Sequence, residues 1–250
     1  MTSNLKLEIC ANSLQSAINA ELGGAYRVEL CDNIYEGGTT PSYGSILLAR
    51  EKLNIKLNII IRPRGGDFHY SDLEFETMKK DIEFARQCEV DGVVIGLLNQ
   101  DGSIDIKRTK ELVKLAKPMS VTFHRAFDVC NDGFQALEDI ISCGCDKILT
   151  SGQQNKAFEG IDTIQTLIEK AKRRITIMPG SGINENNITE IHQKTGAQEF
   201  HASLRKTIKS KMNFRKDGIN MGGIPNIDEF EISVTDPERV KETVKILRKL

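Results

Sequence analysis

The plan of this chain is clearest in residues 58–68, which read NIIIRPRGGDF. The apolar run before Arg62 is typical of a parallel strand that is covered on both faces. Arg62 and Arg64 stand at its carboxyl end, and two glycines and Asp67 follow them. The stretch therefore predicts a buried strand that ends in a positively charged loop, with a helix beyond it.

The same order of an apolar strand, a polar turn and a helix recurs along the chain. The predicted strands are residues 5–11, 26–31, 56–62, 92–97, 120–123, 147–149, 175–178 and 199–202. The predicted helices are residues 13–22, 43–53, 71–88, 106–116, 132–143, 161–171, 185–195 and 236–250. Right-handed helical crossovers between parallel strands, repeated eight times in 250 residues, predict a single-domain (β/α)8 barrel that spans residues 1–250.

Two features bear on this prediction. A doubly wound open sheet is the alternative, but it favours a glycine-rich turn after the first strand, and CANSLQ at residues 10–15 contains no glycine. The segment from Ser203 to Thr235 is too long for a simple connection. It contains Met212, Phe214 and the MGG of Met221 to Gly223, so we expect a lid or an interface rather than disorder.

The composition limits the classes of function. A net charge of −1 argues against nucleic acid or a membrane surface as the main partner. No apolar run reaches the roughly 18 residues that a membrane span needs. The first ten residues lack the pattern of an export signal. The six cysteines are therefore expected to be free thiols in a cytoplasmic protein.

Polar side chains gather where the predicted strands end, which is where barrels of this kind build their sites. The candidates for catalysis, if the protein is an enzyme, are Glu8, Glu29, Arg62, His124, Arg125 and His201. Strand parity places Glu8 and Glu29 inside the barrel, with Arg62, His124 and Arg125 as the expected partners of these carboxylates. The alternative is a structural network of ion pairs that plugs the barrel.

A second group of residues suits an anion. Loops after the last two strands of such barrels often bind phosphate through backbone N–H groups and a helix N-terminus. The candidates for anion binding are Arg64, Ser151, Gly180, Ser181, Gly182 and Ser203. The alternative is a glycine turn that binds no ligand.

Two cysteines repeat one pattern, because LEIC and VELC end at Cys10 and Cys31, 21 residues apart. If the two strands are in register, these thiols lie on one face of neighbouring strands about 4.8 Å apart. Two thiolates suit a soft ion such as copper(I). The alternative is that both cysteines are small residues of the core.

Several motifs in this order resemble the CutC family of copper homeostasis proteins. They are LEIC, VELC, EGGTTPS, IIIRPRGGDFHYS, TFHRAFD, ILTSGQ, MPGSGI and EFHAS, and they extend over nearly the whole chain. The resemblance implies a barrel fold, a cytoplasmic location and a homo-oligomer. It also implies that copper(I) binds to the cysteines that are Cys10 and Cys31 here.

Copper(I) binding explains the paired cysteines but leaves the arginines and histidines without a role. The second hypothesis is therefore an enzyme that acts on a small anionic or phosphorylated metabolite. Arginine would hold the anion in two hydrogen bonds, and His124 or His201 would transfer protons near neutral pH. A third class, a scaffold without a ligand, predicts no saturable binding of either kind.

Overall fold

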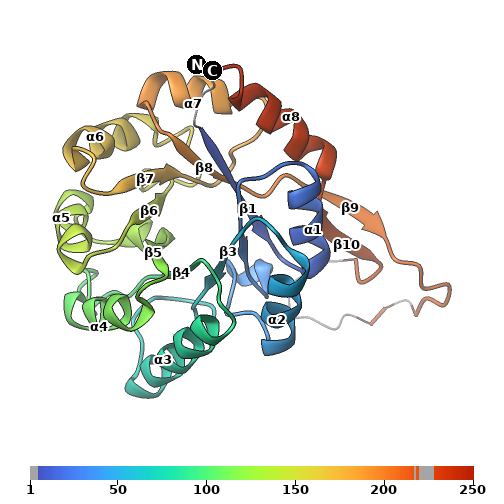
Figure 1. Cartoon of the computed structure of the whole chain (residues 1–250), viewed down its shortest axis with the longest axis horizontal. Coiled ribbons are helices and arrows are strands. Elements are labelled where there is room, and N and C mark those ends of the chain that lie inside the picture. The colour runs from blue at the N-terminus through green and yellow to red at the C-terminus, as the bar shows by residue number, and fades with distance from the viewer. Residues whose placement is uncertain (1–4, 217, 220–227) are drawn as a thin grey trace.

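The computed structural model describes residues 5–216, 218–219 and 228–250, and it shows a ring of strands surrounded by helices (Figure 1). The strands of the ring are β1 (Lys6–Ala11), β2 (Arg27–Leu30), β3 (Lys56–Ile60), β4 (Gly92–Ile95), β5 (Ser120–Phe123), β6 (Lys147–Thr150), β7 (Thr176–Pro179) and β8 (Glu199–Ala202). The helices are α1 (Leu14–Leu22), α2 (Tyr43–Lys52), α3 (Asp72–Gln87), α4 (Ile106–Ala116), α5 (Gly133–Cys143), α6 (Ile161–Ala171), α7 (Ile188–Thr195) and α8 (Pro237–Leu247). The predicted (β/α)8 barrel is confirmed.

Hydrogen bonding joins the strands in the order β7-β6-β5-β4-β3-β2-β1-β8, and every pair is parallel. β7 and β8 lie next to each other and nearly close the ring. The carboxyl ends of all eight strands therefore meet at one end of the barrel.

Side-chain caps set the helix starts where the sequence offers Ser or Asp. Ser71 and Glu74 form a reciprocal capping box at the start of α3. Ser13 and Asp132 accept backbone N–H bonds at the starts of α1 and α5, as the sequence predicts. α7 begins at Ile188, three residues later than predicted.

The alternation of side chains along each strand separates two layers. On β1 and β2, Leu7, Ile9, Val28 and Leu30 belong to the large apolar core under the helices. The residues between them face the inside of the ring and include buried charged groups. None of the described helices is both long and apolar enough to cross a membrane.

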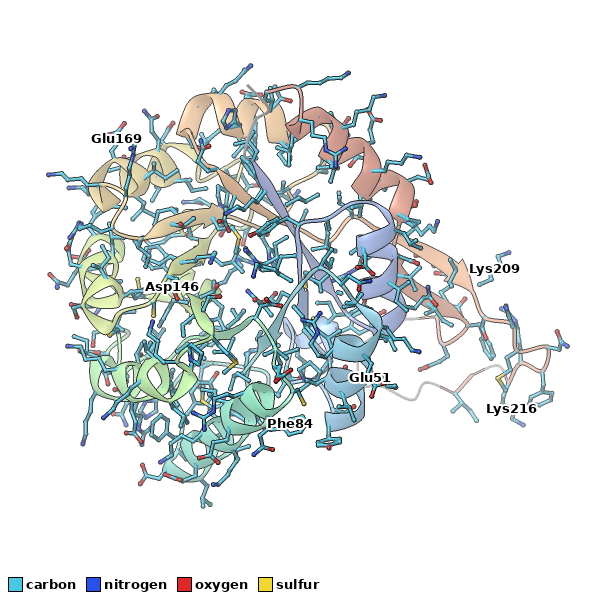
Figure 2. All side chains as sticks on the ribbon, viewed as in Figure 1. Glu51, Phe84, Asp146, Glu169, Lys209 and Lys216 are labelled. Carbon is cyan, nitrogen blue, oxygen red and sulfur yellow. The ribbon has the colours of Figure 1, made fainter. Side chains whose placement is uncertain are left out.

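The long connection after β8 contains structure that the sequence did not reveal. β9 (Arg205–Lys209) pairs antiparallel with β10 (Glu231–Thr235). This two-stranded arm projects away from the barrel, as the labels of Lys209 and Lys216 show in Figure 2. Ser16 and Asn19 of α1 bond to the backbone of Thr235 and anchor its base. The predicted MGG of Met221 to Gly223 lies outside the described residues.

Gly23 and Gly44 give a matched test of packing between the helices. A Cβ on Gly23 would lie 2.5 Å from the Val240 Cβ of α8, whereas a Cβ on Gly44 would meet nothing within 4 Å. We expect Gly23→Ala to lower the free energy of unfolding by about 1–3 kcal/mol, because it overpacks the contact between α1 and α8. Gly44→Ala should raise it by about 0.5 kcal/mol. Urea unfolding measures both; equal effects would contradict the prediction.

Candidate metal centre and barrel-top cavity

The site is built from the inward-facing residues of β8, β1 and β2, which are neighbouring strands. Glu8 on β1 lies level with Arg27 on β2 and with His201 on β8, and Cys10 lies level with Glu29. These side chains alternate with the apolar residues that face the helices. Two layers of polar groups therefore cross the barrel, with Glu8 in the lower layer and Cys10 in the upper one.

The lower layer is a buried ionic network around Glu8. Arg27 bonds to Glu8 through Nε and to Glu199 through Nη2, the latter at 2.9 Å. The Nδ1 atom of His201 lies 2.8 Å from Glu8 Oε1. Burial opposes ionisation, but the charge of Arg27 and the bond from His201 outweigh it and lower the pKa of Glu8 to about 2. Glu8 is therefore an anion that fixes the ring of His201.

The prediction of which residues pair with the interior carboxylates was wrong. Glu8 pairs with Arg27 and His201, while Arg62, His124 and Arg125 make their bonds elsewhere. Sequence reasoning missed Arg27 and Glu199. The alternation in RVELC and EFHAS contains them, two residues before Glu29 and His201, on the same face of their strands.

The upper layer brings two thiols together. Cys10 Sγ lies 3.7 Å from Cys31 Sγ. The two cysteines lie on the same face of the sheet, as predicted, but at different levels along the strands. Cys10 is opposite Glu29, and Cys31 stands two residues after Glu29. Arg205, at the base of the arm, lies with Nη2 3.6 Å from Cys10 Sγ. The contact between Cys10 and Arg205 therefore links the thiol pair of the barrel to the arm.

The environment gives these groups different protonation states. The hydrogen bond with Cys31, together with His201 and Arg205, holds the pKa of Cys10 well below its usual range. That same bond and burial raise the pKa of Cys31. Burial raises the pKa of Glu29 to about 8, so this carboxyl is mostly protonated at neutral pH. Bonds to Cys10 and Glu8 overcome burial and raise the pKa of His201.

The donor atoms of this cluster fit a metal ion. One ligand atom each from Cys10, Glu29 and His201 lies within 4.8 Å of the other two. Two thiolates at bonds of about 2.3 Å would stand about 4.6 Å apart in a linear complex, so a separation of 3.7 Å between the sulfurs favours a bent pair with a third donor. His201 Nε2 faces this space, and a carboxylate on its other nitrogen is the usual support of a metal-binding histidine.

A cavity of about 290 Å³ lies next to the thiols at the carboxyl end of the barrel. Its wall includes six of the predicted residues: Cys10, Glu29, Arg62, His124, Arg125 and His201. Ile60, Phe68 and Leu149 add an apolar part. The structure thus gathers one of the two predicted cysteines, two of the predicted arginines and both predicted histidines around one space. Figure 2 shows how side chains fill the interior of the ring of strands.

Arg125 is held at the edge of this cavity by Asp128, which follows β5. The Arg125 Nε atom lies 2.6 Å from Asp128, and Arg125 Nη2 donates to Ser151 Oγ at 2.9 Å. Ser151 also bonds to Asp128 through its backbone N–H and its hydroxyl. Ser151 therefore positions the wall of the cavity but does not line it.

The other residues predicted to bind an anion lie outside the lining of this cavity. Arg64 bonds to Glu74, in the first turn of α3, at 2.5 Å. Ser181 donates to the Asn155 carbonyl, and the Gly182 carbonyl accepts from the side-chain amide of Asn187, which stands just before α7. The Ser203 carbonyl accepts from Thr235, and Gly180 lies against Leu149 and His201. These residues therefore bond within and between loops, and they do not contribute to the wall of this cavity.

The fold and the cluster define a (β/α)8 barrel with a sulfur-rich centre at the carboxyl ends of its strands. The model of the CutC family matches residues 5–206. The chain is 54% identical over 243 residues to a CutC family protein of Bacteroides fragilis, with 97% of each chain covered. It is 46% identical over 235 residues to the human copper homeostasis protein cutC homolog, covering 94% of this chain and 86% of that one. This chain belongs to the CutC family, the copper homeostasis family.

Solved structures agree with this assignment. A crystal structure of the putative copper homeostasis protein CutC from Streptococcus agalactiae matches with a TM-score of 0.76 and 37% identity, over 80% of this chain and 98% of that one. Phosphoribosylanthranilate isomerase from Thermotoga maritima matches with a TM-score of 0.58 and 14% identity, over 98% of this chain and all of that one. The second likeness shows the shared barrel fold alone.

Replacing Arg27 tests the ionic layer. Arg27→Met keeps the length of the side chain but leaves two buried carboxylates without their partner, so we expect the free energy of unfolding to fall by about 3–5 kcal/mol. Arg174→Met is the control, because Arg174 pairs with Glu138 on the surface and should change stability far less. Urea unfolding of both variants measures the difference, and a small loss for Arg27→Met would show that the layer is dispensable.

Proposed function

We propose that this protein binds copper(I) in the cytoplasm through Cys10 and Cys31, with His201 as a third donor. The observation that supports the proposal is the distance of 3.7 Å between the two sulfurs at the carboxyl end of the barrel. Soft thiolates prefer copper(I) to harder ions. All six cysteines are free, and a reducing compartment would keep this close pair in its thiol form.

The neighbouring groups favour a soft monovalent ion over zinc. Cys10, Glu29 and His201 could also serve as zinc ligands. Binding of any metal ion at this cluster would release protons, because the pKa values of Glu29, Cys31 and His201 are all raised. Cys31 Sγ then supplies the second soft donor. Copper(I) is therefore the better match to this set of residues.

An anaerobic competition titration with a chromophoric copper(I) chelator tests this proposal. The wild type should bind one copper(I) per chain, and Cys10→Ser with Cys31→Ser should abolish that binding. The matched control is Cys88→Ser with Cys143→Ser, two buried thiols elsewhere that should leave binding unchanged. Glu8→Gln should weaken it by about 10- to 100-fold, because it removes the support of His201. Unchanged binding in the Cys10 and Cys31 variant would refute the proposal.

We also propose that the protein assembles as a homo-oligomer through the β9–β10 arm. Four exposed apolar side chains lie on the strands of the arm or in the segment that follows β9: Ile208, Met212, Phe214 and Ile232. An exposed two-stranded ribbon with apolar residues is costly in water and favours a protein contact. Light scattering on the wild type should give a multiple of 27.9 kDa. Phe214→Lys with Ile232→Lys should give the monomer mass, and an unchanged mass would assign the contact to another face.

A further inference from the structure

The wall of the barrel-top cavity contains two buried N–H groups for which the described residues provide no hydrogen-bond acceptor. They are Nε2 of His124 and Nε of Arg62. Both side chains are 4% exposed, and both residues line the cavity. A buried donor without an acceptor costs free energy. The buried Tyr70 hydroxyl interacts with Arg62, so the donor that most needs an acceptor from a ligand is His124 Nε2.

The chemical state of His124 follows from its contacts. Its Nδ1 accepts the backbone N–H of Ala126 at 3.1 Å, so the ring proton resides on Nε2. Burial and the charge of Arg62 lower its pKa to about 3, which keeps the ring neutral at pH 7. A Cβ on Gly96 would come within 2.3 Å of the ring, and Phe68 packs against it with ring centres 5.0 Å apart. His124 is therefore a rigid neutral donor.

Arg62 adds a fixed positive charge. Its Nη atoms donate to the carbonyls of Glu36, Gly38 and Gly66 at 2.7–2.8 Å, and the guanidinium lies over the Phe68 ring at 5.1 Å. In the described part of the chain, no carboxylate forms an ion pair with it. A buried guanidinium without a counterion is unfavourable. An anion in the cavity would supply the missing charge.

The cavity distinguishes between two kinds of anion. The lining also includes the acidic residue Glu36, which disfavours a doubly charged phosphate, whereas the charges of Asp128 and Arg125 offset each other in an ion pair. The glycine turn after β7 is not part of the lining, so backbone N–H groups for three phosphate oxygens are not provided there. Two N–H donors match the two oxygens of a carboxylate, and Ile60, Phe68 and Leu149 suit a short apolar chain.

We propose that the cavity is a binding site for a small organic monocarboxylate, whose oxygens accept hydrogen bonds from His124 Nε2 and Arg62 Nε. This site is separate from the thiol pair, although the two share the cavity. It accounts for the arginine and histidine that copper(I) binding leaves without a role. The volume of about 290 Å³ limits the ligand to a small molecule.

Butyrate and inorganic phosphate are the probes for this site, titrated at constant ionic strength and pH 7 by isothermal calorimetry. We expect saturable butyrate binding with a Kd on the order of 1 mM, and phosphate binding at least about tenfold weaker. His124→Phe keeps an aromatic ring but removes the donor, and should weaken butyrate binding by about tenfold or more. His69→Gln is the control, because His69 is exposed outside the cavity and should change nothing.

A second readout in the wild type keeps the test decisive if His124→Phe is unstable. The ¹⁵N resonance of His124 Nε2 should shift on addition of butyrate, while that of His69 stays constant. The variant Cys31→Ser, at a thiol that does not line the cavity, should retain butyrate binding although it loses copper(I), which separates this site from the copper proposal. Tighter binding of phosphate than of butyrate, no saturable binding of butyrate, or no shift at His124 would overturn the inference.

Discussion

The burial of Glu8 inside the ring of strands is the constraint on which the rest of the site depends. A lone carboxylate in this position would be too costly, and Arg27 and His201 make it tolerable through charge and hydrogen bonds. Arg27 in turn requires Glu199 on β8. The pairing therefore ties β8, β1 and β2 together where the first and last strands of the barrel meet, and it sets the orientation of His201 toward the thiols.

Two structural contacts, one through His201 and one through Arg205, reach the cluster around Cys10. With Nδ1 of His201 held by Glu8, Nε2 is left for the cluster of Cys10 and Glu29. The arm enters the same cluster through Arg205, which contacts Cys10 Sγ. A change in how the arm is packed would therefore reach the sulfur atoms directly. This connection gives the long insertion after β8 a place in the site as well as on the surface.

The cavity lining combines two chemically different sets of residues. Cys10 and His201 form one set, and Arg62 and His124 form the other. Arg62 is fixed by carbonyls of the loops after β2 and β3, so its charge is part of the barrel's construction. Soft-metal binding needs no guanidinium, and carboxylate binding needs no thiol. The structure supports assigning these two tasks to separate groups within one space.

The sequence by itself determined the strand and helix order, the barrel, the interior position of Glu8 and Glu29, and the set of strand-end residues from Cys10 to His201. Periodicity carries this information, because alternation along a strand decides which side chains face inward. Only the tertiary structure decided the partners. The register between strands placed Cys10 opposite Glu29, and the closure of the ring brought Glu8 to His201 across 193 positions of sequence. Loop conformation turned Arg64 away from the cavity. Register, closure and loop path depend on contacts between distant segments, and no local pattern of residues encodes them.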